Sequence, residues 1–513
     1  MLYKLFVSAL TLPLLCCHLN AENRMVWQYS VEKQPSADLG NGYYRNPVLV
    51  GTQGDVTICQ KGHDYYMTHT NFGTPKMLIW HSTDLVNWEP LDFALKEYIG
   101  TVWAIDLDYY DGYFYLYMPV ITNIDKGGRH FTNMVMKAEN PAGPWEGPYD
   151  LGFGRIDPGH VVDTNGQRYV YVDKGYLHKV SNDGLKADTT AYKVYDGWPI
   201  PEDWVFECHC LESPKFTWYN NYCYMISAQG GTSGPSTAHM VTVARSKSAA
   251  GPWENSPVNP LVRTKTRSER WWRQGHGDFA VDADSNWWMM YTGYENGYES
   301  FRKINLLLPI DWNADGWPII KNDYQSTDMI PKPAGKSVKH GLSLSDNFEG
   351  TKLGLQWHWL EHYTPVNRYK LKNGSMIMQA SGYNLKSASK ILVSPTNYAY
   401  EFVTKLVIDN GVEAGLIMCD RASENAVGAG IRKGQVFSTW RSKQHVAVPF
   451  RKTEVYLKVR NDNYDISTFY SLDGVLWRKF YKSGRSTGTT VGGIYCFGEG
   501  KAEFEFFKYQ GLD

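Results

Sequence analysis

A short aromatic strand that follows a tight turn recurs five times along the chain, and this repeat limits the fold more than any other feature. The equivalent aromatic residues are 49 to 64 residues apart. Turn residues followed by alternating apolar positions are typical of half-buried strands that start at a hairpin. A repeat of about 40 to 50 residues has the size of one propeller blade, whereas a sandwich or a β-helix gives shorter, more regular periods. The copies, each with its aromatic residue, are Gly62–Met67 (Tyr66), Asp111–Leu116 (Tyr115), Asn165–Val170 (Tyr169), Asn221–Met225 (Tyr224) and Asp284–Met289 (Trp288).

The five copies predict an all-β chain whose N-terminal part is a five-bladed β-propeller. A chain of 513 residues is too long for one core, so a second domain is expected. The repeat ends near Asp315–Pro318, and the polar segment that follows is typical of a linker. Alternating strands such as Tyr400–Val407 come next, as in an antiparallel β-sandwich. We therefore expect a propeller at 22–330, a linker at 331–344 and a sandwich at 345–513.

The first 21 residues are typical of a secretion signal. Lys4 supplies a positive charge before the apolar run Leu5–Leu15, and Ala21 offers a small residue for cleavage. The run is short for a membrane span, and no other long apolar stretch follows. A lipid anchor on Cys16 is disfavoured because a leucine stands before it where a small residue is expected. The mature chain is thus expected to be exported to the periplasm or the medium, without a membrane span.

Charge and composition exclude some classes of partner. The formal net charge is −1, and a nucleic-acid or acidic-lipid partner would need a basic excess. The chain has 19 Trp and 36 Tyr. Flat aromatic rings stack on sugars, but they also fill β-rich cores, so this composition is compatible with a carbohydrate ligand without requiring one.

Six cysteines follow the predicted signal, too few and too scattered for a disulfide scaffold. The segment Cys208–Cys210, with a histidine between the two cysteines, could suggest a metal site. No second pair of ligands stands at zinc-site spacing, so buried thiols or one disulfide are favoured.

Three carboxylates in apolar or small surroundings stand at the beginnings of expected inner strands: Asp55, Asp106 and Glu212. A propeller gathers these strands around one axis, so such side chains can meet there. An unpaired carboxylate in such surroundings is costly unless it has a function. Two neighbouring carboxyl groups, one protonated and one ionised, are the requirement for acid–base hydrolysis of a glycosidic bond.

The motifs around these carboxylates resemble glycoside hydrolase family 43, from Arg45 to about Pro318. Several of the motifs are individually specific, and they occur in the order of the family. They are Arg45–Leu49 followed by Gly54-Asp55, His81–Trp88, Trp103–Asp106, Glu212–Pro214, Gln229–Thr232, Ala244–Ser246, Gly275–Gly277 and Asp315–Pro318.

The resemblance implies an inverting, single-displacement mechanism. Asp55 would be the general base that activates water, and Glu212 the general acid that protonates the leaving oxygen. Asp106 would raise the pKa of the acid and orient it, because a nearby negative charge disfavours ionisation. Asp108 and Glu207 are nearby acids and remain rival candidates.

The resemblance also implies substrate contacts. Trp103 would be a platform for the sugar, Arg273 would lie near the substrate, and His276 would stand in the central channel beside a cation, which would be calcium. No cofactor is expected for the chemistry itself.

Some positions depart from the family. Gly54 and Val56 replace the prolines that flank the usual base, and Ile105 replaces the proline before Asp106. No carboxylate is lost. The stretch Ser345–Phe348 resembles the start of the concanavalin-like accessory sandwich of the β-xylosidase-like members.

We therefore expect a secreted, exo-acting hydrolase of xylose- or arabinose-containing plant-cell-wall polysaccharides or oligosaccharides, a β-xylosidase or α-L-arabinofuranosidase active in xylan degradation. The alternatives are a non-catalytic glycan-binding propeller, and a hydrolase of the same family that acts on galactan or arabinan. A retaining furanosidase of the five-bladed invertase type is disfavoured, because its Asn-Asp-Pro-Asn opening is missing. The sequence leaves the oligomeric state open.

Overall fold

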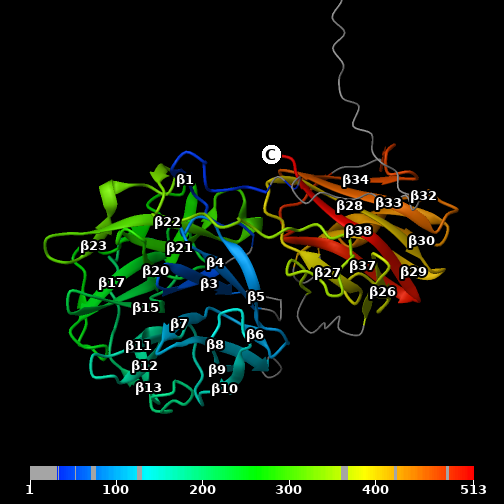
Figure 1. Cartoon of the computed structure of the whole chain (residues 1–513). Coiled ribbons are helices and arrows are strands. Elements are labelled where there is room, and N and C mark those ends of the chain that lie inside the picture. Colours follow the sequence, from blue (N-terminus) through cyan, green and yellow to red (C-terminus); the bar gives the residue numbers. More distant parts are fainter. Residues whose placement is uncertain are drawn as a thin grey trace, which may run out of the picture.

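The computed structural model of the chain describes residues 32, 34–51, 54–70, 77–123, 130–359, 368–420, 425–480 and 484–513. The predicted secretion signal lies outside these residues. The described chain forms two β-rich parts that lie side by side (Figure 1). Within the described ranges the only helices are the short 3-10 turns Asp173–Gly175, Glu299–Phe301 and Lys321–Asp323, so the predicted all-β class is confirmed. None of these helices is long and apolar enough to cross a membrane.

The N-terminal part contains five successive antiparallel sheets. The first sheet consists of β2 (Gly54–Lys61), β3 (Asp64–Thr70), β4 (Met77–Ser82) and β5 (Glu89–Leu95). The second consists of β6 (Thr101–Val102), β7 (Asp106–Tyr110), β8 (Tyr113–Asn123), β9 (His130–Ala138) and β10 (Glu146–Asp150). The third consists of β11 (Gly159–Val162), β12 (Arg168–Val172), β13 (Tyr176–Val180) and β14 (Tyr192–Lys193).

The fourth sheet consists of β15 (Leu211–Tyr219), β16 (Tyr222–Gln229), β17 (Met240–Ser246), β18 (Glu254–Asn255) and β19 (Val262–Arg263). The fifth consists of β20 (Trp271–Val281), β21 (Trp287–Glu295), β22 (Lys303–Trp312) and β23 (Pro318–Ile320). A separate pair, β1 (Tyr43–Arg45) and β24 (Met329–Pro331), joins the beginning of this part to its end.

Each copy of the sequence repeat falls on the first hairpin of one of these sheets. The turns connect β2 to β3, β7 to β8, β11 to β12, β15 to β16 and β20 to β21. Residues with left-handed backbone lie in these turns, such as Gly62 with φ 65° and Asn221 with φ 62°. Glycine and asparagine adopt this conformation at low cost, which is why they occur in the repeat.

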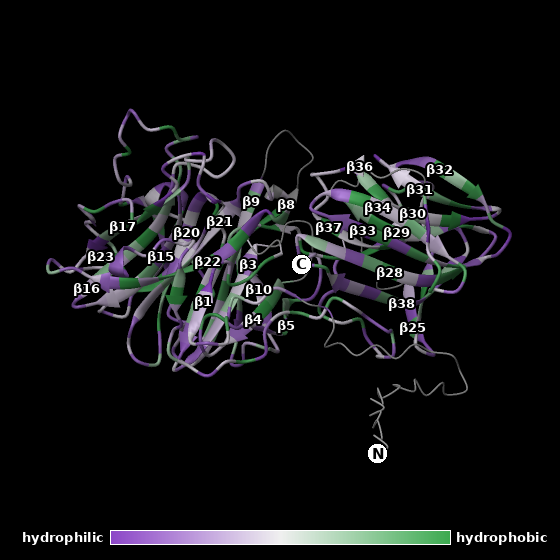
Figure 2. Cartoon of the chain, turned by 90° about the horizontal axis from the view of Figure 1, so that it is seen from above, coloured by the Kyte–Doolittle hydropathy of each residue, from purple (hydrophilic) through white to green (hydrophobic). Residues whose placement is uncertain are grey.

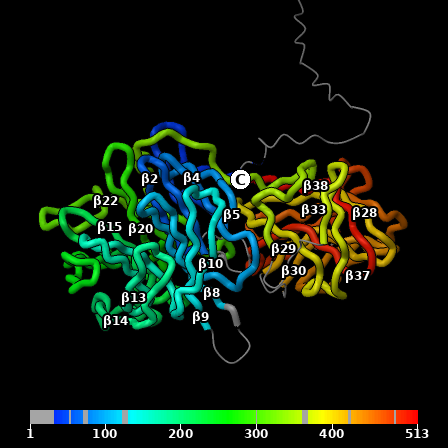
Figure 3. The backbone as a smooth tube through the Cα atoms, turned by 60° about the horizontal axis from the view of Figure 1, so that its bottom comes forward, coloured from blue at the N-terminus to red at the C-terminus, as the bar shows by residue number. Residues whose placement is uncertain are grey.

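The hairpin strands that begin the sheets form a closed ring. Contacts link β2 to β7, β7 to β11, β11 to β15, β15 to β20 and β20 back to β2. In Figure 3 the sheets follow one another around the N-terminal part, from blue through cyan to green. Side chains on these five strands therefore face a common centre.

A buried polar cluster joins the five strands at this centre. The carboxylate of Asp106 on β7 lies 2.5 Å from the ammonium of Lys215 on β15, and it accepts the backbone N–H of His160 on β11 at 2.7 Å. The hydroxyl of Thr57 on β2 lies 3.4 Å from Asp106 and 3.5 Å from the carboxylate of Asp278 on β20. We call these residues the Asp106 cluster. It takes one group from every sheet of the ring.

The linker was expected at 331–344. Pro331 ends β24, and residues 332–344 lie along the first sheet. Lys332 forms ion pairs with Asp38 at 2.5 Å and with Asp84 at 3.0 Å. The N–H of Gly341 donates to the carbonyl of Trp88 at 2.8 Å. The segment is thus attached to the N-terminal part up to the point where Leu344 enters the core of the C-terminal part.

The C-terminal part is a sandwich of two antiparallel sheets, with hydrophobic residues distributed along the strands (Figure 2). Its core is buried between the sheets and contains Phe402, Leu416, Leu457, Ile494 and Phe504. One sheet consists of β25 (Tyr369–Lys372), β26 (Ser375–Gln379), β38 (Lys501–Gly511), β28 (Ala399–Ile408), β33 (Glu454–Asp462), β34 (Asp465–Ser471), β35 (Arg478–Lys479) and β36 (Gly484–Arg485). The other consists of β27 (Ser389–Val393), β37 (Val491–Glu499), β29 (Gly411–Cys419), β30 (Ala426–Arg432), β31 (Gln435–Trp440) and β32 (Lys443–Pro449).

The sandwich packs against the fifth sheet of the N-terminal part. The hydroxyl of Tyr398 donates to the carboxylate of Glu295 at 2.5 Å, and its ring lies 4.4 Å from that of Tyr298. The hydroxyls of Ser300 and Tyr464 are 2.7 Å apart. Aromatic packing and polar contacts together therefore fix the sandwich relative to the ring.

The Asp106 cluster can be tested by its contribution to stability. Asp106→Asn leaves the ammonium of Lys215 buried without its carboxylate, so we expect the free energy of unfolding to fall by about 3 kcal/mol or more. Equilibrium unfolding in urea measures this change. Asp92→Asn is the matched control, because Asp92 pairs with the exposed Lys96 at 2.9 Å, and its loss should stay below about 1 kcal/mol. Equal losses in the two variants would contradict the role of the cluster.

Candidate active site

A cavity of about 560 Å³ opens at the centre of the ring, a size typical of small-ligand sites. The charged side chains that line it include Asp55, Asp157, Glu212, His276 and Lys303. They come from three of the five sheets and from the loop that precedes a fourth. The tertiary fold thus brings together two of the three carboxylates that the sequence singled out, Asp55 and Glu212.

β-Bulges place these residues. Asp55, with φ 55°, stands at a register shift of β2, and His276, with φ 49°, stands at one of β20. Ser213, which follows Glu212, has φ 52° at a register shift of β15. Non-glycine residues seldom adopt such backbone, and a bulge re-aims the side chains next to it. Repeated local strain at one site indicates that the position of these groups is functional.

Asp55 is held in its ionised form. The residue is only 4 % exposed, and burial by itself raises its pKa. The ammonium of Lys303, which contacts the carboxylate, outweighs burial and, with the neighbouring His276, keeps the pKa of Asp55 well below its usual range. The Nδ1 atom of His276 lies 3.4 Å from Asp55 Oδ1. Lys303 was not singled out in the sequence.

Glu212 is held in its protonated form at neutral pH. Burial raises the pKa of Glu212, the carboxylate of Asp157 raises it further, and the ammonium of Lys303 offsets only part of this effect. The resulting pKa is about 8. Two carboxyl groups in one cavity therefore have opposite protonation states.

Asp157 is fixed next to Glu212 by two contacts. Its Oδ2 accepts the backbone N–H of Ser213 at 3.2 Å, and Nε2 of His276 lies 3.2 Å from the same oxygen. His276 therefore bridges the surroundings of Asp157 and Asp55, and the charge of Asp157 lies close to the acid.

The expected role of Asp106 is not supported. Asp106 does not line the cavity, because its carboxylate pairs with Lys215 inside the Asp106 cluster. Of the carboxylates that raise the pKa of Glu212, that of Asp157 has the largest effect, and Asp106 is not among them. Of the rival acids, Asp108 contacts Nδ1 of His160 at 2.5 Å outside the cavity, whereas Glu207 lines the cavity.

The distance along the chain to the repeated aromatic residue distinguishes the cavity residues from Asp106. Asp157, Glu212 and His276 each lie twelve residues before the repeated aromatic residue of their sheet, and Asp55 lies eleven before. Asp106 lies only nine residues before Tyr115. Counting back from the aromatic residues would therefore have selected Asp157 and not Asp106.

Of the two other predicted substrate contacts, Trp103 lines the cavity and Arg273 does not. Trp103 lines the cavity with its ring 5.1 Å from that of Phe131, so its role as a sugar platform stays a prediction that the geometry allows. Arg273 is not among the lining residues, since its guanidinium donates to the carbonyl of Gly234 at 3.0 Å and lies over the ring of Tyr294. A substrate contact by Arg273 has no support in this arrangement.

The described residues provide no ligand set for a cation. No group of three or more His, Cys, Asp or Glu side chains that could hold a metal ion occurs in the part of the chain that the structure describes. Calcium beside His276 thus stays a prediction that rests on the resemblance alone. For Cys208 and Cys210 the sequence left two alternatives, buried thiols or one disulfide. In the structure the two cysteines form a disulfide in the cavity wall.

An ionised and a protonated carboxyl group in one cavity are what acid–base hydrolysis of a glycosidic bond requires. Residues 44–318 match the family described as Glycosyl hydrolases family 43, and residues 345–510 match the domain described as Beta xylosidase C-terminal Concanavalin A-like domain. The first match covers more than half of the chain, so the chain belongs to glycosyl hydrolase family 43. Membership in this family and a concanavalin-like C-terminal sandwich, both expected from the sequence, are confirmed.

Individual relatives agree with this assignment. The chain is 29 % identical to the non-reducing end alpha-L-arabinofuranosidase BoGH43B of Bacteroides ovatus over 375 residues, which cover 68 % of this chain and 67 % of that protein. It is 28 % identical to a beta-xylosidase of Formosa agariphila over 403 residues, or 70 % and 64 % of the two chains. The solved xylan beta-1,4-xylosidase of Bacillus halodurans superposes with a TM-score of 0.80 at 22 % identity, over 91 % of this chain and 99 % of that one, and so has the same fold.

The pH dependence of activity tests the role of Asp157. Activity that needs protonated Glu212 should fall as the pH rises through about 8. Asp157→Asn removes the neighbouring negative charge and lowers the pKa of Glu212, so the alkaline limb of kcat/KM should move to lower pH by about one unit. Asp106→Asn, assayed at a temperature where it remains folded, should leave this limb in place. A shift in Asp106→Asn and none in Asp157→Asn would reverse the assignment.

Proposed function

We propose that this chain is an inverting exo-glycosidase that removes terminal xylosyl or arabinofuranosyl residues from plant-cell-wall oligosaccharides and polysaccharides. The observation that carries the proposal is the pair formed by Asp55 and Glu212, whose pKa values are shifted in opposite directions within one cavity. We infer that the five sheets are the blades of a five-bladed propeller, which would explain why residues from separate sheets meet at one centre.

In this proposal Asp55 is the general base and Glu212 the general acid. The Asp55 carboxylate takes a proton from a water molecule, and the oxygen of that water forms a bond to the anomeric carbon. At the same time Glu212 gives its proton to the glycosidic oxygen, and the carbon–oxygen bond to the leaving group breaks. Asp55 ends protonated and Glu212 ionised, and exchange of protons with solvent restores both. Such a mechanism needs about 6.5 to 9.5 Å between the two carboxyl groups to leave room for the water.

Other residues keep the two carboxyl groups in the protonation states that the reaction needs. Lys303 and His276 hold Asp55 ionised, and Asp157 together with burial keeps Glu212 protonated. Trp103 would provide a face on which the sugar ring stacks. Asp106 acts only on stability in this proposal, through the cluster that joins the strands.

Two sugars are proposed because they can present similar atoms to one small pocket. The relative in Bacteroides ovatus is named an alpha-L-arabinofuranosidase, and that in Formosa agariphila a beta-xylosidase. A cavity of about 560 Å³ has room for the end of a short oligosaccharide. The N-terminal segment, with Lys4 before the apolar run Leu5–Leu15, supports export of the protein.

A substrate screen combined with two variants tests the activity. Nitrophenyl β-D-xyloside, α-L-arabinofuranoside and galactoside are compared, and we expect turnover of the first or the second. Asp55→Asn assayed on the nitrophenyl glycoside, and Glu212→Gln assayed on the corresponding disaccharide, whose leaving oxygen needs a proton, should each lower kcat by at least about 10²-fold, the usual contribution of acid–base catalysis. Thermal unfolding checks that both variants are folded. Near-normal activity in either variant removes that residue from the mechanism, and glycan binding without any turnover would favour a binding module.

The stereochemistry of the product tests the mechanism separately. Proton NMR of the first sugar released should show the anomeric configuration opposite to that of the substrate, because water attacks the face away from the leaving group. The spectrum must be recorded before mutarotation. Retention of configuration would mean that a carboxylate attacks the sugar, so Asp55 would not act as a base.

A further inference from the structure

A short segment beside Glu212 forms part of the cavity wall and has no role in the chemistry described above. We call Val205–Cys210 the strap. It lies against the loop 230–237. The N–H groups of Glu207 and Cys208 donate to the carbonyl of Gly230 at 2.9 and 3.3 Å, and the N–H of Gly230 donates to the carbonyl of Cys210 at 3.2 Å. The strap is thus attached to the loop along most of its length.

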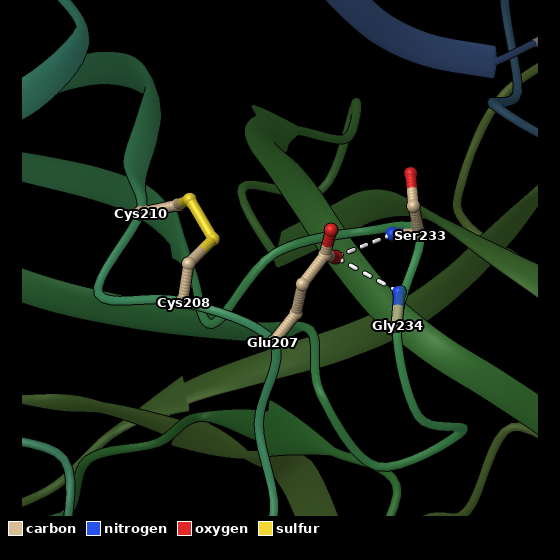
Figure 4. The surroundings of a disulfide bond; sticks show 5 residues. All are labelled: Glu207, Cys208, Cys210, Ser233 and Gly234. Carbon is tan, nitrogen blue, oxygen red and sulfur yellow. Dashed lines mark hydrogen bonds between the residues drawn. A yellow bond between two sulfur atoms is a disulfide. The ribbon is translucent and has the colours of Figure 1, made fainter.

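The disulfide between Cys208 and Cys210 holds the strap in a tight turn, with 5.2 Å between the two Cα atoms (Figure 4). The approach to the loop is close enough to require glycine. A Cβ atom on Gly231 would lie 2.6 Å from Oε2 of Glu207 and 2.9 Å from Sγ of Cys208. A Cβ atom on Gly234 would lie 2.6 Å from Cβ of Glu207. Strap and loop therefore form one compact unit.

The side chain of Glu207 is oriented by this unit. Its Oε2 accepts the N–H groups of Ser233 at 2.6 Å and Gly234 at 2.9 Å (Figure 4). Among the described residues none donates to the other oxygen, Oε1. Glu207 lines the same cavity as Asp55 and Glu212. A carboxylate with one oxygen fixed and the other available can accept a hydroxyl of a sugar with little loss of side-chain entropy.

The strap adjoins Glu212 along the chain, and in the proposed function the leaving group sits beside Glu212. It ends at Cys210, two residues before Glu212, and Glu212 donates its proton to the leaving oxygen in the proposed function. Asp55, Asp157 and His276 line the cavity and are buried. Glu207 is exposed and so belongs to the mouth. A chain that leaves the cavity past Glu212 therefore passes the strap.

We propose that Glu207 is a specificity-determining residue that binds a hydroxyl group of the leaving-group sugar, and that the disulfide-closed strap presents it. The inference rests on the proposed function and adds a site for the second sugar of the substrate. The leaving group is then a sugar with a free hydroxyl that reaches Glu207, so the enzyme distinguishes oligosaccharides from glycosides with an apolar aglycone.

The test compares two substrates that differ only in the leaving group, xylobiose and nitrophenyl β-D-xyloside. We define the preference ratio as kcat/KM for the disaccharide divided by kcat/KM for the nitrophenyl glycoside. Glu207→Ala should lower this ratio about tenfold, as expected for the loss of one charge-assisted hydrogen bond. Glu207→Gln keeps an oxygen for the N–H groups of the loop and should lower the ratio in the same direction but less. If arabinofuranosides are the better substrates, the corresponding pair is used.

Glu202→Ala is the matched control, because Glu202 is an exposed glutamate near the strap that does not line the cavity. Its preference ratio should equal that of the wild type. A merely structural effect of Glu207→Ala would lower both kcat/KM values together at a constant ratio, and this result would overturn the proposal. If the wild type hydrolyses neither substrate, the proposed function fails, and calorimetric binding of xylobiose then decides about Glu207. Equal affinity of the wild type and Glu207→Ala would overturn its role as a binding residue.

Discussion

The ion pair between Asp106 and Lys215 is the interaction on which the rest of the N-terminal part depends. It lies at the centre of the ring, and the cluster around it takes one group from each of the five sheets. Burying two charges costs several kcal/mol each unless partners compensate for the lost water. The strands must therefore meet in the one arrangement that satisfies these groups, and hydrophobic packing between the sheets alone would tolerate small displacements.

The Asp106 cluster also fixes the level at which the reactive groups stand. Its members lie nine or ten residues before the repeated aromatic residues, and the cavity residues lie eleven or twelve before them. On β2, for example, Thr57 belongs to the cluster and Asp55 to the cavity. Two layers of side chains thus follow each other along the same strands. The bulges between them turn Asp55, Glu212 and His276 toward the cavity.

This layering explains why the sequence does not distinguish Asp106 from Asp55 and Glu212. In the sequence, a carboxylate at the beginning of an inner strand has the same appearance whether it belongs to the cluster or to the cavity. The motifs around Asp55, Asp106 and Glu212 therefore support all three residues equally. The partner of Asp106 is Lys215, which is 109 residues away along the chain. No local pattern identifies such a pair. Asp157 has the spacing of a cavity residue from Tyr169, but its effect on the pKa of Glu212 depends on its position next to Glu212 in the fold.

The sequence by itself determined the all-β class, the two-part organisation, the hairpins that begin the five sheets, and two of the carboxyl groups in the cavity. These features follow from turn residues, alternation and local motifs, which act over a few residues. Only the tertiary structure showed what keeps Asp55 ionised and Glu212 protonated, and that Cys208 and Cys210 form a disulfide beside Glu207. The physical reason is that protonation depends on burial and on charges such as Lys303 and Asp157, which are far apart in the chain.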